Sequence, residues 1–134
     1  AGRAAGGGDA IVDDAMGGGG DATAPAEVDT TNIFVSLSAA REIACGIDDA
    51  GNGWCWGDNT YDQVGQGALH GTSTITSPVA VDMPEGETFN AISVGTYNAC
   101  ATSAANGAWC WGNNDFGQLG NDTTSARFAP DAVQ

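Results

Sequence analysis

His70 is the only histidine in the sequence, and Ser73 follows it three residues later. A Ser-His-acid nucleophile would have to use this imidazole as its base. The surrounding residues contain no Gly-x-Ser-x-Gly elbow and no other activating context. We therefore interpret His70 as a solvated loop residue, and we predict no catalytic residues and no enzymatic activity.

Acidic and amide side chains gather in two turn-like stretches that could bind a hard cation. Asp58 and Asp62 lie in the first stretch and Asp115 in the second, each with asparagines nearby. Their oxygens are of the kind that Ca²⁺ prefers, but the spacing does not match an EF-hand loop. Such side chains in tight turns usually bond their own backbone. We predict no metal and no cofactor, with calcium at these aspartates as the alternative.

Four cysteines form two pairs with the same spacing. Cys45 and Cys55 are ten residues apart, as are Cys100 and Cys110. Each pair brackets a turn-rich centre, so an antiparallel hairpin would make its cysteines direct cross-strand neighbours, near the distance that a disulfide spans. A zinc site is the alternative, but it favours close C-x-x-C pairs. Two regular disulfides indicate an oxidising compartment, so we expect a secreted or cell-surface protein.

Tryptophan, glutamine and glycine recur beside these cysteines. The indole rings could stack on sugars, but their place on the central hairpin favours core packing. The recurring glutamines are better explained as amides that satisfy backbone groups inside a turn than as catalytic groups. The predicted core residues are Trp54, Trp56, Trp109 and Trp111. The predicted turn residues are Gly57, Gln63, Gly65, Gly112, Gln118 and Gly120.

One short motif concerns covalent modification. Asn121 begins an Asn-Asp-Thr sequence, which is an acceptor pattern for N-glycosylation. Hydroxyl side chains in 72–76 and 123–125 offer further attachment points. We keep Asn121 as a glycosylation candidate.

The sequence contains an internal repeat. Residues 53–59 return as residues 108–114, 55 positions later and without a gap. The same offset relates Phe34 to Phe89, Leu37 to Ile92, Cys45 to Cys100 and Gln63 to Gln118. A fixed period of this length indicates repeated structural units, each of which leaves an apolar face for a neighbour to cover. Two units are too few to cover each other at both ends.

Short apolar or β-branched runs bounded by small polar residues predict several strands in each unit. In a strand, Trp54 and Trp56 point to one face and Cys55 to the other, so both faces are nonpolar, as in a sheet between neighbouring sheets. Pro78 suits the first position of an edge strand. Without helical periodicity, we predict an all-β fold with repeats over 33–87 and 88–134.

Residues 1–32 differ from the repeats. They are rich in Gly, Ala and Asp and contain no aromatic residue, which leaves roughly a hundred residues for a core. Their apolar patch includes Ile11, Val12 and Met16, which we predict as assembly candidates that could add a strand to another subunit. A flexible linker or a processed leader remnant is the alternative.

The charge of the chain limits its partners. The formal net charge is -14, with no lysine and three arginines. Such a surface repels phosphate backbones and anionic lipid, so we predict no nucleic-acid binding. No apolar run approaches the roughly 18 residues of a membrane helix, so we predict no membrane insertion. Because the chain begins at Ala1, we expect that any signal peptide has been removed.

The repeated segments resemble the repeats of the regulator of chromosome condensation family. The family hallmark is a strand that ends in Trp-Gly, followed by Asn and then by Gln-Leu-Gly, and residues 111–120 match it closely. Residues 56–65 match with two replacements, Asp62 for glycine and Val64 for leucine.

The resemblance extends upstream of these motifs. Residues 93–101 resemble the family's Ser-x-Gly-x-x-His-x-x-Ala strand, with Asn98 at the histidine position. The first copy departs further, with Ala40 at the glycine position and Ile43 at the histidine position. The resemblance covers about 33–134, and the paired cysteines resemble those of secreted bacterial members.

This resemblance implies a seven-bladed β-propeller of four-stranded blades. Seven units of this length need roughly 385 residues, so two units cannot close a ring within one chain. We expect a fragment, a part of a multi-chain ring or an open polymer of blades. The family's nucleotide-exchange and chromatin-binding activities depend on basic loops that this sequence does not reproduce, and we do not extend them to it.

Two hypotheses follow for the function. The first is a non-catalytic extracellular structural protein that self-assembles, as a filament or surface-layer subunit, through open blade ends and an N-terminal strand. Its partner would be itself, as a homo-oligomer or polymer. The second is a secreted module that binds a protein or glycan through the loops 58–76 and 113–127.

Overall fold

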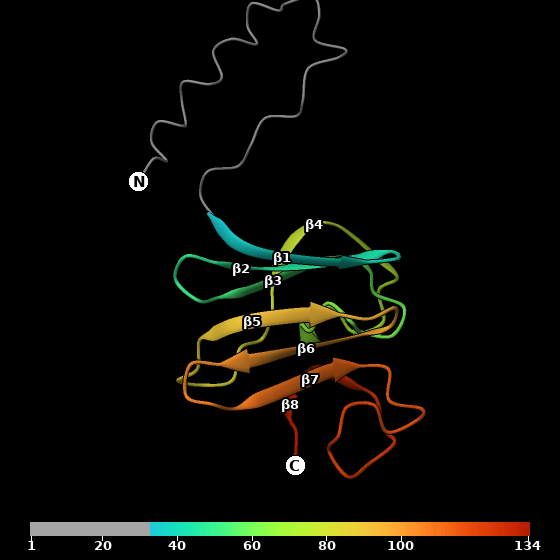
Figure 1. Ribbon diagram of the computed structural model, residues 1–134. Helices are drawn as coiled ribbons and strands as arrows, with labels where there is room; N and C mark the ends of the chain where they lie inside the picture. Colours follow the sequence, from blue (N-terminus) through green and yellow to red (C-terminus); the bar gives the residue numbers. More distant parts are fainter. Residues whose placement is uncertain (1–32) are drawn as a thin grey trace, which may run out of the picture. The chain divides into compact units, whose positions relative to one another are not determined.

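The computed structural model describes residues 33–134, so the N-terminal segment 1–32 and its assembly candidates Ile11, Val12 and Met16 lie outside the described residues. Eight strands form two four-stranded antiparallel sheets, each with its strands in chain order (Figure 1). We call the sheets blade 1 and blade 2. The prediction of an all-β fold with two blades that do not close into a ring is confirmed.

The strands of the two blades occur in the same order. Blade 1 contains β1 (Phe34–Ala40), β2 (Ile43–Asp48), β3 (Gly53–Asp58) and β4 (Thr74–Ala80). Blade 2 contains β5 (Phe89–Val94), β6 (Asn98–Ser103), β7 (Ala108–Gly112) and β8 (Arg127–Ala132). A short 3-10 helix, η2 (Gly67–Leu69), lies in the loop between β3 and β4. Among the described residues, no helix is long and apolar enough to cross a membrane.

Strand register gives each blade two different faces. Cys45 is opposite Cys55, which is in turn opposite Val79, so these three side chains share one face. We call it the disulfide face; its other members include Ser38, Ile43 and Ile47. Trp54 and Trp56 lie on the opposite side, as the sequence predicts. We call that side the tryptophan face; with these two it includes Phe34, Leu37, Ala44 and Gly46.

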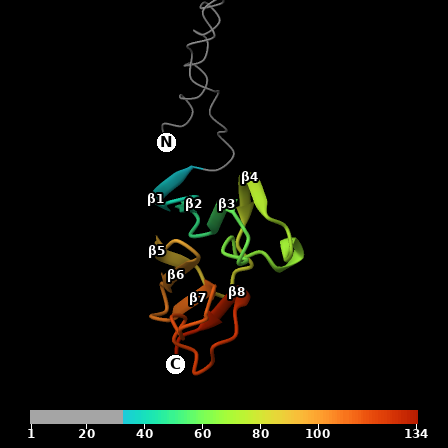
Figure 2. The ribbon, with the colours of Figure 1, turned by 90° about the vertical axis from the view of Figure 1, so that its right-hand side faces the viewer.

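The tryptophan face of blade 2 packs on the disulfide face of blade 1. Figure 2 views the two sheets as adjacent layers, with β5 close to β1 and β2. The shared core consists of Ile43, Cys45, Ile47, Cys55, Val64 and Val81 of the first repeat with Phe89, Ile92, Ala99, Ala101 and Trp111 of the second. Between the edge strands β1 and β5, the Val94 backbone N–H donates a hydrogen bond to the Ser38 hydroxyl at 3.2 Å. The blades therefore form one core, in which neither sheet has to be stable alone.

The hairpin turn between β2 and β3 is organised by Asp48, which is 5% exposed. Its carboxylate accepts hydrogen bonds from the backbone N–H groups of Ala50 and Asn52, each at 2.9 Å, and from the Trp54 indole Nε1 at 2.9 Å. Burial alone would raise the pKa of Asp48. The hydrogen bonds from Trp54, Asn52 and Ala50 together outweigh burial and hold the pKa below its ordinary value of 3.8.

The corresponding turn of blade 2 lacks this carboxylate. Ser103 is at the position of Asp48, and its hydroxyl accepts a hydrogen bond from the Gly107 N–H at 3.0 Å. The Trp109 Nε1, whose counterpart in blade 1 donates to Asp48, is buried without an acceptor. The two turns therefore have different hydrogen-bond networks.

Asp48 should make stability depend on acid pH. Because its folded pKa is lowered, its contribution is present above the unfolded pKa of 3.8 and is lost as pH falls through the folded value. We expect Asp48→Asn to lower the free energy of unfolding by about 1–2 kcal/mol at neutral pH. It should also weaken the fall in stability below about pH 4. Urea denaturation across this range measures both effects, with Asp49→Asn at the exposed neighbour as control. Equal acid dependence in the two variants would contradict the prediction.

The unpartnered Trp109 indole provides a second test. We expect Ser103→Asp to supply the missing acceptor and to raise the free energy of unfolding by about 1 kcal/mol at neutral pH. Ser103→Ala should lower it, since the Gly107 N–H then loses its acceptor. If Ser103→Asp is no more stable than Ser103→Ala in urea, the proposed hydrogen bond does not form.

Candidate protein-binding face

A tight turn after β3 supplies a platform for the neighbouring blade. Gln63 holds this turn, because its Oε1 accepts the Tyr61 N–H at 2.8 Å and its Nε2 donates to Asp58 at 2.9 Å. The Asn59 Oδ1 accepts the Val64 N–H at 3.0 Å. Gln63 is thus a turn residue rather than a group that faces a substrate.

The second repeat builds the same turn with the same contacts. The Gln118 Oε1 accepts the Phe116 N–H at 2.9 Å, and its Nε2 donates to Asn113 at 2.8 Å. The Asn114 Oδ1 accepts the Leu119 N–H at 2.9 Å. Both turns can therefore present an outward backbone carbonyl and a glycine to whatever lies against them.

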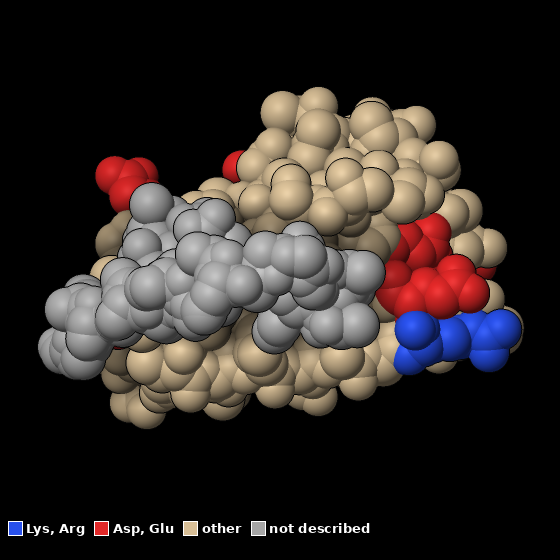
Figure 3. Space-filling model, turned by 90° about the horizontal axis from the view of Figure 1, so that it is seen from above, with Lys and Arg blue, Asp and Glu red and all other residues tan. Residues whose placement is uncertain are grey.

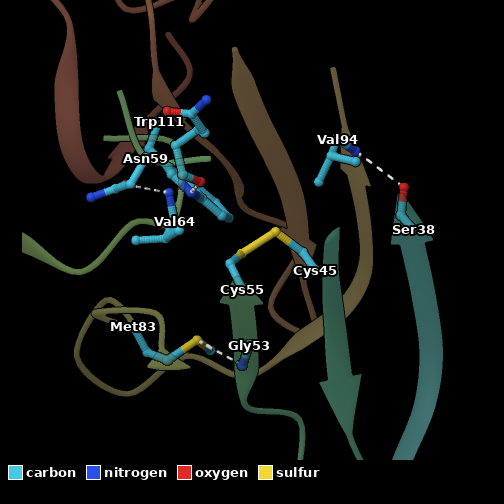
Figure 4. The surroundings of a disulfide bond; sticks show 10 residues. Ser38, Cys45, Gly53, Cys55, Asn59, Val64, Met83, Val94 and Trp111 are labelled. Carbon is cyan, nitrogen blue, oxygen red and sulfur yellow. Dashed lines mark hydrogen bonds between the residues drawn. A yellow bond between two sulfur atoms is a disulfide. The ribbon is translucent and has the colours of Figure 1, made fainter. Parts of the chain in front are cut away.

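Trp111 of blade 2 fits against the first turn. It lies beside Val64 and Asn59 of that turn (Figure 4). Its Nε1 donates to the Gln63 backbone carbonyl at 2.9 Å, its side chain is fully buried, and its ring is stacked with Phe89 at 6.0 Å. Gly65 has a positive φ of 74°, and a Cβ at this position would lie 2.6 Å from the Trp111 Nε1. Glycine is therefore required here both by the backbone and by the approach of the indole.

The equivalent face of blade 1 is open among the described residues. Leu37 is 63% exposed, whereas Ile92 at the same position of blade 2 is 8% exposed. Trp56 is only partly buried and packs on Phe34 with ring centroids 5.9 Å apart, whereas Trp111 is fully buried. Figure 3 views this side, and the described residues visible there are mostly uncharged, with acidic and arginine side chains near the margin. Blade 1 thus presents an apolar face of the type that blade 2 buries.

The structure also locates the other predicted residues. The disulfides join Cys45 to Cys55 and Cys100 to Cys110, the pairing expected from the sequence. Of the four tryptophans, only Trp111 is fully buried, and the other three are partly buried. For Trp56 the physical reason is that its face is open. Glycines 57, 65, 112 and 120 all have positive φ. Gly65 and Gly120 lie in the loops after β3 and β7, whereas Gly57 and Gly112, which were predicted as turn residues, lie within β3 and β7 where the strand register shifts.

The three aspartates of the calcium alternative lie in separate hydrogen-bond groups. Asp58 accepts from Thr60 and Gln63, and Asp115 accepts from Asn113. Asp62 contacts His70 instead. Within residues 33–134, no three His, Cys, Asp or Glu side chains are grouped in a way that could hold a metal ion. The fold does not bring this ligand set together.

Asn121, the glycosylation candidate, is 7% exposed. Its Nδ2 donates to Asp131 at 2.7 Å, and its Oδ1 accepts from the Thr123 hydroxyl at 2.9 Å. The nitrogen that would carry a glycan is therefore used inside the folded blade, and the structure opposes modification of the folded chain.

His70 belongs to a contact between the blades at their outer rim. Its Nδ1 lies 2.8 Å from the Asp62 carboxylate, and its ring packs on Phe128 of blade 2 at 5.0 Å. Tyr61 packs on Tyr97 of blade 2 in a second such contact, at 4.8 Å. The Ser73 backbone carbonyl accepts the Asn59 N–H. Among the described residues, no hydrogen bond joins the Ser73 hydroxyl to His70.

Sequence reasoning paired Leu37 with Ile92 and Phe34 with Phe89 and predicted an uncovered apolar face, but it did not identify which residues form that face. The signal was present in the 55-residue offset. It could be interpreted only after strand register showed which residues share a side with Trp56, and after packing showed which side of blade 2 meets blade 1.

Two four-stranded antiparallel sheets, stacked face to face through a tryptophan and a glycine turn, define adjacent blades of a β-propeller type. Comparison with protein families agrees. Two models described as "Regulator of chromosome condensation (RCC1) repeat" match residues 89–118 and 106–134. These matches over residues 89–134, together with the shared fold, support an RCC1-type β-propeller repeat family for this chain.

Similar curated proteins are much longer. The chain is 27% identical over 99 residues to the human E3 ubiquitin-protein ligase HERC2, with 73% of this chain and 2% of that protein covered. It is 28% identical over 99 residues to the human probable E3 ubiquitin-protein ligase HERC4, with 69% of this chain and 9% of that protein covered. The aligned part thus spans a small share of either relative.

Solved propellers share the fold at low identity. Human WBSCR16 matches with a TM-score of 0.67 and 12% identity, over 79% of this chain and 26% of that one. Prp20p from Saccharomyces cerevisiae, described with its binding to Gsp1p and histones, matches with a TM-score of 0.65 and 13% identity, over 80% and 27%. Yeast RCC1 (Prp20) bound to Kap60 matches with a TM-score of 0.62 and 18% identity, over 75% and 25%.

The contact between Gly65 and Trp111 should control the stability of the blade pair. Gly65→Ala adds a methyl group against the indole and strains a positive φ, whereas Gly71→Ala adds the same strain at φ 90° with no atom within 4 Å. We expect Gly71→Ala to cost about 1–2 kcal/mol in the free energy of unfolding. Gly65→Ala should cost roughly 1–3 kcal/mol more. Urea denaturation of the oxidised proteins measures the difference. Equal losses would show that the Trp111 contact contributes little.

Proposed function

We propose that this chain is a non-catalytic protein-binding module that docks a partner on the tryptophan face of blade 1. The observation that supports this most directly is the contrast between Leu37 and Ile92, which occupy equivalent positions but are exposed and buried, respectively. Monomeric proteins rarely expose contiguous large apolar patches, and such patches often mark interaction sites. Val35 beside Leu37 is 65% exposed and extends the apolar surface.

The relatives are consistent with this class of function. Prp20p is described as binding Gsp1p and histones, and a second structure has the yeast protein bound to Kap60. Those partners belong to those proteins and are not assigned to this chain. What supports a transfer to this chain is that a propeller of the same fold is described as binding proteins.

A second candidate function is self-assembly into a filament or surface layer. The observation that favours it is that both halves of the internal contact recur on the chain. Trp56 is the counterpart of Trp111, and the turn from Gln118 to Gly120 repeats the one from Gln63 to Gly65. We further propose an extracellular location, because two disulfides within 134 residues suit an oxidising compartment. Glycan binding through the loops 58–76 and 113–127 is the third alternative.

Leu37→Asp tests the docking face. Proteins captured by the oxidised chain from the source organism's extracellular medium are identified, purified and titrated against wild type, Leu37→Asp and Phe116→Asp. Phe116 is 92% exposed in the second loop, so its variant is a matched apolar-to-acid control away from the face. We expect Leu37→Asp to weaken binding of a true partner at least about 10-fold. Phe116→Asp should bind normally.

The same variants separate the alternatives. Wild-type binding by Leu37→Asp would contradict the proposed face, and loss in Phe116→Asp alone would assign recognition to the loops. Sedimentation velocity of each protein over a range of concentrations tests self-assembly. Species that grow with concentration and disappear in Leu37→Asp would favour the second candidate, and a constant monomer would exclude it.

A further inference from the structure

The contact between the blades provides a template for what a tryptophan face binds. On blade 1, the disulfide face that receives Trp111 is apolar at Ile43 and Ile47, which are 3% and 2% exposed. Ile75 and Val79 of β4 pack against the same core. The occupied acceptor surface therefore consists of four aliphatic side chains around a buried disulfide.

The disulfide face of blade 2 is polar at the same four positions. Strand register identifies them: Asn98 is opposite Gly112 as Ile43 is opposite Gly57, and Thr102 is opposite Ala108 as Ile47 is opposite Gly53. On the outer strand, Arg127 replaces Ile75, and Asp131 replaces Val79 opposite Cys110. The main chain of the acceptor is thus repeated, but its aliphatic surface is not.

Two of these polar groups, Arg127 and Asp131, form an ion pair, and the Thr102 hydroxyl donates to the Asn90 Oδ1 at 2.6 Å. The Asp131 carboxylate accepts from the Asn121 Nδ2 at 2.7 Å and from the Arg127 Nε at 2.9 Å. The hydrogen bonds from Asn121 and Arg127 keep the pKa of Asp131 below its ordinary value, so the group stays ionised at neutral pH. Covering an ion pair and two polar side chains with an apolar face removes their water without supplying new hydrogen-bond partners, which is unfavourable.

We infer that the disulfide face of blade 2 does not bind a tryptophan face, because it carries Asn98, Thr102, Arg127 and Asp131. The tryptophan face of blade 1 therefore fits a blade of another protein with an aliphatic disulfide face, rather than a second copy of this chain stacked head to tail. This inference rests on the proposed function, since it specifies the partner of the same docking face. The geometry of the partner is that of blade 1 itself, with aliphatic residues at the four positions and a glycine turn that accepts an indole N–H.

The test converts blade 2 into such a partner. An acceptor variant carries Asn98→Ile, Thr102→Ile, Arg127→Ile and Asp131→Val, the residues that blade 1 has at these positions, together with Leu37→Asp to disable its own tryptophan face. Its matched control carries Leu37→Asp alone. Each is mixed with the wild-type full chain, and complex formation is measured by sedimentation velocity and titration. A second acceptor, with only Arg127→Ile and Asp131→Val beside Leu37→Asp, keeps the net charge of the control and serves if the fourfold variant does not fold.

We expect wild type to form a 1:1 complex with the acceptor at least about 10-fold tighter than with the control, by analogy with central apolar contacts at interfaces. Addition of Trp56→Ala to the wild-type partner should remove this complex. Equal binding to acceptor and control, or an open head-to-tail polymer of wild type, would overturn the inference. If neither binds while a natural partner still requires Leu37, the partner chemistry is wrong but the docking face stands. If no partner requires Leu37 either, the proposed function fails as well.

Discussion

The fold depends on the burial of one tryptophan face by one disulfide face. Trp111 is the centre of this contact, because its indole is fully buried and also satisfies a backbone carbonyl of the preceding blade. A buried indole N–H without an acceptor is costly, so the direction of the Gln63 carbonyl helps to fix how the second sheet lies on the first. The glutamine and asparagine contacts inside the turn fix that carbonyl. Polar groups within the turn therefore determine the position of an apolar sheet.

The outer faces of the two blades differ in polarity, as the packing of repeat proteins helps to explain. In repeat proteins, each unit gains stability from its neighbours, and terminal units need a polar outer face to remain soluble. Blade 2 has such a face, with Asn98, Thr102 and an ion pair where blade 1 has aliphatic residues. Blade 1 keeps Phe34, Leu37 and two tryptophans on its open side. The outer face of blade 2 is thus polar and that of blade 1 is apolar, and the proposed docking rests on this contrast.

The sequence could predict the strands, the disulfides and the turn glutamines because each depends on local spacing. Cys45 and Cys55 pair because a ten-residue hairpin brings them opposite each other, whatever surrounds the hairpin. The uncovered apolar face was expected from the repeat, but the residues that form it could not be predicted in the same way. Leu37 and Ile92 have similar side chains, and only the order in which the blades stack makes one exposed and the other buried. Likewise, the sequence alone did not show that the Trp109 indole lacks an acceptor. This became clear only when Ser103 was found at the position of Asp48 in the hairpin turn.

The two disulfides differ in burial, although the hairpins that they close are alike. Both cysteines of the Cys45–Cys55 bond are fully buried, because the bond is part of the surface on which blade 2 lies (Figure 4). The Cys100–Cys110 bond lies on the outer side of blade 2, where Cys100 is partly exposed. Each closes a short loop, which stabilises a small domain by roughly 2–3 kcal/mol in the chain-entropy model. Such cross-links matter most where few interfaces exist. Among the described residues one interface joins the two sheets, and the covalent bond in each hairpin adds to it.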